Sequence, residues 1–351
     1  MLGDFYKGKR VLVTGHTGFK GSWLTKMLCE LGAQVTGYAL EAPTNPSLFE
    51  LLDLPINSVI GDIRDFDKLK GVFDGFQPEI VLHLAAQPIV KTSYKIPRYT
   101  FDTNVMGTVN VCECVRLSDS VKSFINVTTD KVYENEDLDV AFTEDMPLDG
   151  WDPYSNSKSC SELVTHSYKK SFFNSSDIAV STARAGNVIG GGDFADDRIV
   201  PDCVRAVMSG NDIIVRNPYS TRPFQHVLEP LYVYLMIAMK QYENKAFQGY
   251  YNVGPDEDDC ISTGELCDIF CKHWQNGAKW KNISEKDAVH EAGFLKLDTT
   301  KLKTTFGWKP VWNIDTALKK VVEWTKVYAE GGDINSVCKN QINEFLKEIG
   351  Y

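Results

Sequence analysis

Residues 9–31 read KRVLVTGHTGFKGSWLTKMLCEL. An apolar run over residues 9–14 is followed directly by three closely spaced glycines and then by an amphipathic run over residues 22–31. This order predicts a buried strand, a tight turn and a helix. Glycine lets the backbone approach a pyrophosphate closely, and the amides at a helix N-terminus face the anion. The stretch therefore predicts a dinucleotide site, with contacts from the turn residues Gly15, Thr17, Gly18, Phe19 and Gly21.

Strand and helix patterns alternate over the following part of the chain. Apolar runs predict strands over residues 33–39, 58–63, 80–86, 124–127 and 178–184, and helical patterns extend from about 100 to 117 and from 154 to about 173. This alternation predicts an α/β protein with a Rossmann-like, doubly wound parallel sheet. Because such sheets bind ligands at the carboxyl ends of their strands, we expect further cofactor contacts from Asp62, Ile63, Leu84, Ala85, Ala86 and Asn104.

The residues alone leave the choice between NAD and NADP open. NAD sites of this kind use a carboxylate at the end of the second strand to hold the ribose. Here the predicted strand ends at Ala39, and Glu41 is the nearest acid. The sequence also has no cluster of arginines here that could bind the 2′-phosphate of NADP.

A second stretch carries groups suited to acid–base chemistry. Thr129, Asp130 and Lys131 follow the apolar run 124–127. If that run is a buried parallel strand, a hydroxyl, a carboxylate and an ammonium stand at its ligand-binding end. The same three residue types are also ordinary in loops, so they become informative only beside a dinucleotide site.

Tyr154 and Lys158 are four residues apart, which on a helix places both side chains on one face. A positive charge near a phenol favours the phenolate, and each unit of pKa is worth roughly 1.4 kcal/mol. We therefore expect the pKa of Tyr154 to be depressed by Lys158. The same spacing occurs by chance in many helices, so this pair also depends on a dinucleotide site for its meaning.

The chain changes character after Ala185. Residues 186–193 are glycine-rich and predict a loop that leaves the sheet, without a regular element. Later polar clusters bring arginines to loops, where guanidinium groups suit diphosphate binding; solvated surface arginines are the alternative. We expect residues 1–185 to form an NAD-binding domain and residues 186–351 to form mainly a smaller α/β substrate-binding lobe, with some segments returning to the first domain.

Composition narrows the functional classes. The 37 basic and 47 acidic side chains give a net charge of −10, which argues against binding to nucleic acid or to an anionic membrane. No secretory signal and no apolar run of membrane-spanning length is present in the sequence. The nine cysteines are scattered and odd in number, which favours reduced thiols over a disulfide framework or a metal site. We therefore expect a cytoplasmic enzyme without a metal.

Taken together, these motifs resemble the extended short-chain dehydrogenase/reductase family over nearly the whole chain. Within it, the sequence is similar to the 4,6-dehydratases that act on CDP-glucose, and the matching segments are residues 15–23, 45–50, 128–131, 152–154, 185–193 and 225–231. Two positions depart from the family pattern, with Phe224 in place of Trp and Val132 in place of Cys. Dehydratases of dTDP-glucose carry Asp-Glu where this chain has Asp130-Lys131, which favours the CDP-glucose branch.

The resemblance implies roles for individual residues. Phenolate Tyr154, with its pKa depressed by Lys158 and by the nicotinamide charge, would take the proton of the sugar C4 hydroxyl while hydride passes to NAD, and Thr129 would bind the C4 oxygen. Lys131 would remove the C5 proton, and a protonated Asp130 would donate to the departing C6 hydroxyl, so both need shifted pKa values. The side chains implied for the nucleotide diphosphate are Asn187, Arg198 and Arg222.

The resemblance also implies that NAD remains bound, since it is regenerated in each turnover, and that two copies of the chain pair through the helices after Asn104 and Tyr154. A nucleotide-sugar 4-epimerase shares the fold, the cofactor and the Tyr154–Lys158 pair, but it has no use for the Asp130-Lys131 couple. A non-catalytic NAD-sensing protein on the same fold is a further alternative. The intact Thr129, Tyr154 and Lys158 argue against that last possibility.

Overall fold

The protein is described by a computed structural model that covers residues 2–135, 140–284 and 295–350. Its larger lobe contains a seven-stranded sheet in the order β11-β6-β5-β4-β1-β2-β3, and every neighbouring pair is parallel. The strands are β1 (Arg10–Thr14), β2 (Gln34–Ala39), β3 (Asn57–Ile60), β4 (Ile80–His83), β5 (Ser123–Thr129), β6 (Ala179–Ala185) and β11 (Tyr250–Val253). The predicted doubly wound α/β class is confirmed.

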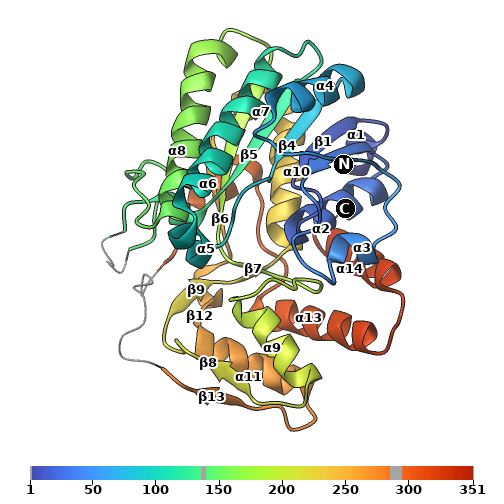
Figure 1. The fold of residues 1–351 in the computed structure, drawn as a ribbon, viewed down its shortest axis with the longest axis vertical. Coiled ribbons are helices and arrows are strands. Elements are labelled where there is room, and N and C mark those ends of the chain that lie inside the picture. Colours follow the sequence, from blue (N-terminus) through green and yellow to red (C-terminus); the bar gives the residue numbers. More distant parts are fainter. Residues whose placement is uncertain (1, 136–139, 285–294, 351) are drawn as a thin grey trace.

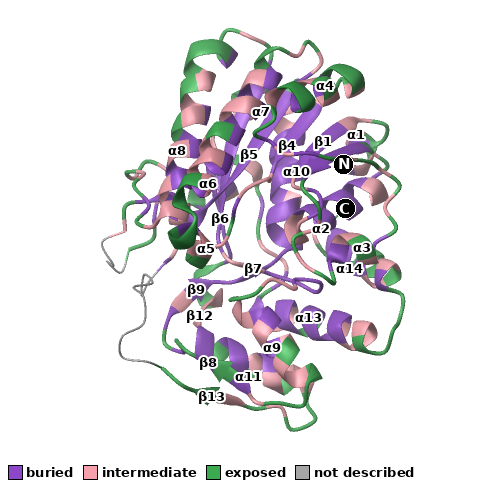
Figure 2. Ribbon diagram, viewed as in Figure 1, coloured by how far each residue is buried: buried purple, intermediate pink, exposed green. Residues whose placement is uncertain are grey.

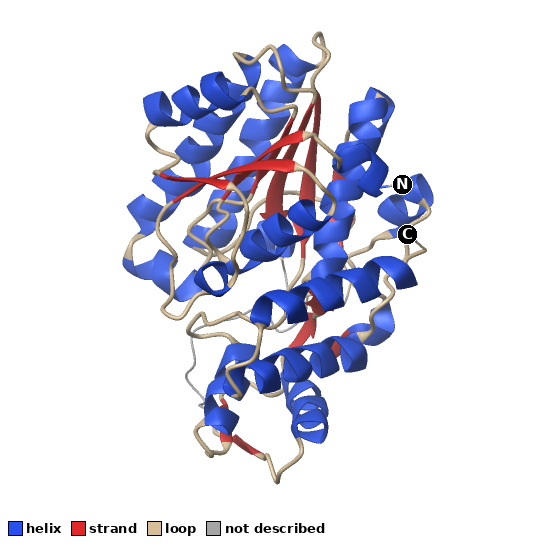
Figure 3. Cartoon of the chain, turned by 90° about the vertical axis from the view of Figure 1, so that its right-hand side faces the viewer, coloured by secondary structure: helices blue, strands red, loops and turns tan. Residues whose placement is uncertain are grey.

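Helices cover both faces of this sheet (Figure 3). They are α1 (Leu2–Tyr6), α2 (Phe19–Glu30), α3 (Leu48–Leu51), α4 (Phe66–Phe76), α5 (Val90–Lys95), α6 (Pro97–Phe101), α7 (Gly107–Arg116), α8 (Pro153–Tyr168), α10 (Leu228–Glu243), α12 (Thr300–Phe306) and α14 (Ile334–Glu348). Successive side chains of a strand point to opposite faces. Accordingly, Phe124 of β5 packs in the cluster with α4 and α7, whereas Ile125 packs in the cluster with α2, α10 and α14. Figure 2 shows the resulting buried centre.

The predicted helix from about residue 100 to 117 is built from three pieces. It begins as α6, passes through a π-helical turn, η1 (Asp102–Met106), and continues as α7. Such a turn inserts one extra residue and is often found at functional sites. Here it carries Asn104, whose side chain accepts a hydrogen bond from the amide of Gln87 at 2.8 Å and donates to the Gln87 carbonyl at 3.1 Å.

A smaller lobe lies below the sheet in Figure 1. Its helices are α9 (Ile199–Met208), α11 (Thr263–Trp274) and α13 (Ile314–Ala329), and its strands are β7 (Val188–Ile189), β8 (Ile213–Val215), β9 (Thr221–Pro223), β10 (Gln225–His226), β12 (Cys260–Ser262) and β13 (Trp280–Asn282). A separate apolar cluster that includes Phe224, Phe270 and Leu318 holds this lobe together. The chain crosses between the lobes several times, because α10, β11 and α14 pack in the larger one.

The prediction of an irregular loop over residues 186–193 is wrong at two positions. Val188 and Ile189 form β7, which pairs in parallel with Gln225 and His226 of β10. Two residues are too short to leave a periodic signal in the sequence, and the pairing partner lies far along the chain. The pairing fixes the segment that leaves the sheet directly against the Arg222 region.

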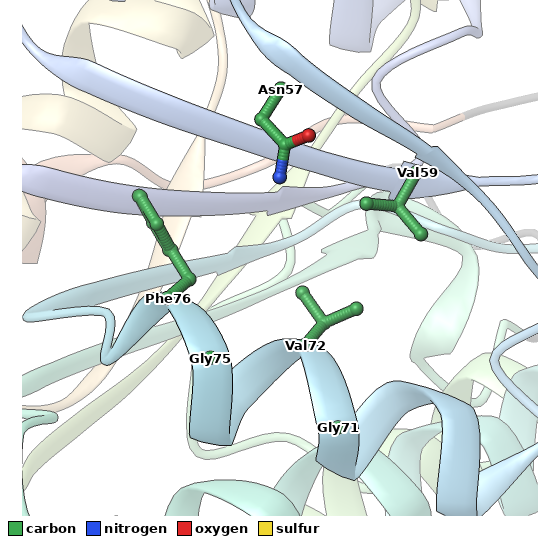
Figure 4. A pocket seen from close by; sticks show the side chains of 6 residues that line it. All are labelled: Asn57, Val59, Gly71, Val72, Gly75 and Phe76. Atoms are coloured by element: carbon green, nitrogen blue, oxygen red, sulfur yellow. The ribbon is translucent and has the colours of Figure 1, made fainter.

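Five short turns complete the described structure: the 3₁₀ turns η2 (Asp130–Val132), η4 (Lys245–Phe247) and η5 (Glu257–Asp259), and the π turns η1 and η3 (Lys169–Phe173). Among the described residues, no helix combines the length and the apolar character that crossing a bilayer requires. A shallow hollow between β3 and α4 (Figure 4) is lined by Asn57, Val59, Gly71, Val72, Gly75 and Phe76. These side chains carry no ionisable group, so the hollow offers no acid–base chemistry.

Candidate active site

The carboxyl end of β5 leads directly into the first set of polar groups. All seven residues of β5 are buried, and the chain then turns into η2. Thr129 caps this turn, because its hydroxyl accepts a hydrogen bond from the amide of Lys131 at 3.4 Å and donates to Asp130 Oδ1 at 2.9 Å. The predicted hydroxyl, carboxylate and ammonium therefore do stand at the end of a buried parallel strand.

Asp130 is the most enclosed ionisable group of this turn, with 1% of its surface exposed. Burial raises its pKa, against the lowering effect of Lys131, Thr129, Arg222 and Lys20. Its Oδ2 atom has no hydrogen-bond partner among the described residues. A buried carboxyl with a raised pKa and one open oxygen can hold a proton and donate it to a ligand.

The first turn of α8 positions Tyr154. Asp152 caps the helix by accepting hydrogen bonds from the amides of Tyr154 and Ser155, each at 3.0 Å, and Pro153 occupies the first helical position. The hydroxyl of Thr129 lies near the phenol of Tyr154 and lowers its pKa. The helix therefore brings Tyr154 to the end of β5.

Lys158 follows one turn later and is 5% exposed. Its ammonium group donates a hydrogen bond to the carbonyl of Val127 at 3.1 Å, so it is anchored to the same strand, β5. Burial lowers the pKa of Lys158 to about 8, while the charge of Glu162 acts in the opposite direction. The pKa of the Lys158 ammonium therefore lies close to neutral pH, where the group begins to lose its charge.

The predicted depression of the Tyr154 pKa is wrong for the protein alone. Burial raises the pKa of Tyr154 to about 12, and the charge of Asp130 adds to this, while Thr129 and Arg198 lower it. The physical reason is that the surrounding protein desolvates the phenol, and desolvation penalises the phenolate more than Arg198 and Thr129 favour it.

The glycine turn between β1 and α2 has the shape that a pyrophosphate needs. Gly15 has a φ of 79°, and a Cβ at this position would lie 2.8 Å from the amide nitrogen of Ala85. At Gly21 a Cβ would lie 2.0 Å from the carbonyl oxygen of Gly15. At Gly18, by contrast, a Cβ would come no closer than 3.5 Å to its neighbours. Since Gly18 also has no side chain to cap α2, the helix N-terminus is accessible to an anion.

Other predicted cofactor residues surround this turn. The hydroxyl of Thr17 donates to the carbonyl of Leu40 at 2.8 Å, just beyond β2. The amides of Leu84 and Ala85 donate to Thr14 Oγ1, each at 3.2 Å, which fixes the end of β4 against the turn. Ala86 follows directly on this pair, and Phe19 is the first residue of α2.

Three residues predicted to contact the cofactor form interactions within the protein. The carboxylate of Asp62 forms an ion pair with Arg64 at 2.6 Å, and the carbonyl of Ile63 accepts a hydrogen bond from Asn110 at 2.9 Å. The amide group of Asn104 binds Gln87, and its nitrogen also donates to Ser157 at 2.8 Å. These interactions hold the residues in place beside the strand ends.

The predicted diphosphate residues come from the smaller lobe. Asn187 lies between β6 and β7, and its carbonyl accepts a hydrogen bond from the amide of Gln225 at 3.0 Å. Arg222 lies on β9 and is 7% exposed; its charge lowers the pKa of Asp130. Arg198, at the start of α9, pairs with Asp193 at 3.1 Å, and its charge acts on Tyr154. Arg222 is therefore buried near Asp130, whereas Arg198, whose side chain is 35% exposed, acts on Tyr154 with part of its surface in solvent.

Two further residues belong to this site and were not predicted. Lys20, inside the glycine turn, places its ammonium 5.9 Å from the ring centroid of Tyr234 on α10. Burial and the charges of Arg198 and Lys158 lower the pKa of Lys20 to about 8. The hydroxyl of Tyr234 is buried and has no partner among the described residues. In the sequence, the position of Lys20 directly before Gly21 indicates that it belongs to the site. Tyr234 lies in an apolar helical stripe, and nothing in the sequence indicates a role for it.

This fold and this site define an NAD-type short-chain dehydrogenase/reductase with an added acid–base pair. The sequence profile of the family described as GDP-mannose 4,6 dehydratase matches residues 12–321. The chain belongs to this family, within the extended short-chain dehydrogenases/reductases, as the sequence motifs predicted.

Among individual relatives, the chain is 45% identical to the CDP-glucose 4,6-dehydratase of Salmonella typhimurium, an alignment that covers 98% of both sequences. It is 24% identical to the dTDP-glucose 4,6-dehydratase of the same organism, over 90% of this chain and 92% of that one.

Solved structures show the same architecture. A UDP-glucose 4-epimerase of Thermotoga maritima superimposes with a TM-score of 0.80 at 22% identity, covering 91% of this chain and 99% of that one. The dTDP-glucose 4,6-dehydratase of Bacillus anthracis in complex with NAD gives a TM-score of 0.77 at 22% identity, covering 93% and 99%. At these identities the likeness concerns the fold alone.

Proposed function

We propose that the protein catalyses the NAD-dependent dehydration of CDP-glucose to CDP-4-dehydro-6-deoxyglucose. The observation that carries the proposal is the buried Asp130, which has a raised pKa and an open Oδ2 atom. It lies next to Lys131 at the end of β5, the strand on which α8 with Tyr154 and Lys158 packs. The 45% identity to a CDP-glucose 4,6-dehydratase supports the choice of substrate.

The residues around the glycine turn fit NAD. The space beside Gly18 and the accessible N-terminus of α2 would accept the pyrophosphate. Gly15 packs closely on Ala85 at the base of this site. When bound, NAD⁺ accepts a hydride from C4 of the sugar and returns it to C6. We assign its binding to the glycine turn, the ends of β3 and β4, Asn104, Tyr154 and Lys158.

Tyr154 accepts the proton of the C4 hydroxyl. Its pKa of about 12 means that it starts as the neutral phenol and needs positive charge to act as a base at neutral pH. Arg198 already offsets part of the effect of burial, and the positive nicotinamide ring of bound NAD⁺ would supply the remaining charge, with Lys158 held on the same helix. Thr129, whose hydroxyl lies near Tyr154, orients the C4 oxygen.

Asp130 and Lys131 then perform the elimination. The 4-ketone makes the C5 proton acidic, and Lys131 removes it and returns a proton to C5 when the hydride reaches C6. Asp130 donates its proton to the C6 hydroxyl, which leaves as water. Burial raises the pKa of Asp130 and so favours the protonated acid that this step uses, whereas a solvated aspartate is ionised at neutral pH.

Asn187, Arg198 and Arg222 hold the nucleotide diphosphate in this proposal. Of these three residues, Arg222 is the one whose charge lowers the pKa of the proposed acid, Asp130. A 4-epimerase would use Tyr154 and Lys158 but would leave a protonated Asp130 without a function, so dehydration accounts for more of the site. A purely NAD-sensing role would leave Tyr154, Asp130 and Lys131 all unused.

The test is to incubate the purified protein with CDP-glucose and, separately, with UDP-, dTDP- and GDP-glucose, each with and without added NAD⁺. Mass spectrometry then detects the loss of one water. We expect dehydration of CDP-glucose in preference to the others. Isomerisation to a galactose nucleotide without loss of water would support the epimerase instead, and no conversion of any substrate with NAD⁺ present would contradict both.

The outer face of η1, α8 and η3 bears on how many copies of the chain associate. Met106 on η1, Leu163 on α8 and Phe172 on η3 are 49%, 53% and 45% exposed, which is unusual for large apolar side chains. We infer that this face forms a homodimer interface. Light scattering should give twice the chain mass for the wild type, whereas Leu163→Lys should shift the protein towards the monomer.

The cytoplasm is the compartment that we assign to this reaction. All nine cysteines are free, including the buried pair Cys203 and Cys267, whose sulfurs lie 3.9 Å apart without a bond. Free thiols at this density are typical of a reducing compartment.

A further inference from the structure

Glu162 lies one helical turn beyond Lys158 on α8, and its side chain is completely buried. Its Oε1 atom accepts a hydrogen bond from the hydroxyl of Thr128 on β5 at 2.5 Å. Its Oε2 atom accepts hydrogen bonds from Thr182 at 2.7 Å and Arg184 at 3.1 Å, both on β6. One carboxylate therefore joins the catalytic helix to the two strands on which it packs.

Glu162 is ionised despite this burial. Desolvation raises its pKa, but the charge and hydrogen bond of Arg184, together with His166 and Thr128, lower it to about 2. Arg184 is itself only 1% exposed and forms the ion pair with Glu162 at 3.1 Å. A buried carboxylate of this kind is a fixed negative charge over the whole working range of pH.

The position of Glu162 couples it to Lys158. Residues at i and i+4 lie on the same face of a helix, and both side chains reach β5, Lys158 at the Val127 carbonyl and Glu162 at the neighbouring Thr128. We propose that Glu162 is a positioning residue: by tying α8 to β5 and β6 it places Lys158 at the Val127 carbonyl, and its negative charge one helical turn away supports the ammonium for the proton transfer at Tyr154. The proposal rests on the assignment of Lys158 to the active site.

The other groups that face these two side chains do not replace Glu162. His83 of β4 lies near Lys158, but burial lowers its pKa to about 3, so it is neutral. Lys20 of α2 has the same sign as Lys158 and repels it. Burial raises the pKa of Asp130, beyond the carboxyl end of β5, which disfavours its anionic form.

Four other ionisable side chains act on or near Glu162. They are Arg184, His166, Tyr133 at the C-terminal end of η2, and Tyr250 on β11. The pKa of Tyr133 and that of Tyr250 are both raised, chiefly by burial, so neither phenol is an anion. Among the described residues, Glu162 is thus the anion that acts on Lys158, where burial alone would drive the pKa below about 8.

The experiment compares the pH dependence of kcat for dehydration, with saturating NAD⁺ and CDP-glucose, in the wild type and in variants without this carboxylate. Glu162→Gln leaves Arg184 buried and unpaired, which is strongly destabilising. The double variant Glu162→Gln/Arg184→Met removes both charges and is therefore the second, better tolerated form. Thermal melting establishes which variants are folded.

In the wild type we expect the alkaline limb of kcat near pH 8, where Lys158 loses its charge. In the variants without Glu162 this limb should move to lower pH by about one unit or more, with at least roughly a threefold loss of kcat at pH 7.5 and little change in KM. An unshifted limb in a folded variant would overturn the proposal, because a purely structural role lowers stability without moving a titration.

Thr182→Val is the matched control. It removes the 2.7 Å hydrogen bond on the β6 side of Glu162 but leaves the carboxylate and its ion pair with Arg184. We expect it to lower the melting temperature and to leave the alkaline limb in place. A shift of the limb in this variant as large as that in Glu162→Gln would also overturn the proposal.

A second readout does not require turnover. NMR titration of lysine-labelled protein, with Lys158→Met to identify the signal, gives the pKa of Lys158 directly in wild type and variants. If the wild type dehydrates none of the nucleotide sugars, the proposed function fails, and the titration still decides whether Glu162 holds the charge of Lys158. If the wild type is active and the titration does not respond to Glu162, only the inference fails.

Discussion

Asp130 combines two properties that decide what the site can do: it is buried, and one of its oxygens is open. Burial raises the pKa, which favours the protonated carboxyl that an elimination would require. The neighbouring Thr129 holds the other oxygen at 2.9 Å and leaves Oδ2 for a ligand. In the proposed mechanism, Asp130 and Lys131 are the groups that a dehydratase needs beyond those that oxidise and reduce C4.

Asp130→Asn should abolish loss of water while leaving the earlier steps. The amide keeps the shape of the side chain but has no transferable proton, so we expect kcat for dehydration to fall by about 10²–10⁴-fold. Exchange of the C5 hydrogen with deuterium from the solvent should persist, because Lys131 is intact. Lys131→Met is the matched comparison, and it should abolish both exchange and dehydration.

Tyr154→Phe should stop the reaction at its first step. Without the phenol no group of the protein takes the C4 proton, so neither deuterium exchange at C5 nor dehydration should be detected above about 10⁻² of the wild-type rate. Stability should change little, since Asp152 caps the backbone amide of residue 154 and not its side chain. Persistent exchange at C5 in this variant would contradict the role of Tyr154.

At the scale of elements, α8 is the part that assembles the site. It begins at a capped proline turn, carries Tyr154 at the end of β5, and is tied to β5 and β6 through Lys158 and Glu162. The cap is therefore a feature of both stability and function. Helix α4 carries an equivalent aspartate cap, Asp65, whose carboxylate accepts from the amide of Lys68, on the far side of the lobe.

Removing the cap of α8 should affect both activity and stability. Asp152→Ala should lower the free energy of unfolding by about 1 kcal/mol and reduce kcat, because the first turn of α8 positions Tyr154. Asp65→Ala should lower the free energy of unfolding by a similar amount but leave kcat unchanged. Urea denaturation and steady-state kinetics measure the two effects, and equal losses of kcat in both variants would contradict the argument.

At the scale of the whole molecule, one buried carboxylate joins the lobes. Glu229, near the start of α10, accepts hydrogen bonds from the amides of Val311 at 2.9 Å and Trp312 at 2.8 Å, just before α13. Its second oxygen has no partner among the described residues, and burial raises its pKa to about 7 from the usual 4.5. The folded protein therefore binds a proton at Glu229 that the unfolded chain releases.

This difference predicts a pH dependence of stability. Because the folded pKa is the higher one, the free energy of unfolding is greatest below pH 4.5 for this group and falls as the pH rises towards 7. The full difference corresponds to about 3 kcal/mol. Glu229→Gln keeps an acceptor for both amides and should remove this part of the fall. Urea denaturation at several pH values between 5 and 8 measures it, and an unchanged slope would contradict the assignment.

Several features of the site follow from local sequence. Three glycines after an apolar run fix the turn between β1 and α2, because only glycine fits where a Cβ would strike Ala85 or Gly15. The spacing of Tyr154 and Lys158 places both on one face of α8, and Asp130 follows a strand whose apolar run is plain. These are properties of the backbone over a few residues, and neighbouring positions in the chain are sufficient to specify them.

What the tertiary structure decided is the environment of these groups. In the protein alone, burial raises the pKa of Tyr154 against the depression expected from Lys158, and it also raises the pKa of Asp130. The pairing of β7 with β10 and the approach of Lys20 to Tyr234 join residues far apart in the chain. Desolvation and charge act through space and depend on everything packed around a group, so the sequence named the catalytic candidates, while the fold determined their protonation and their neighbours.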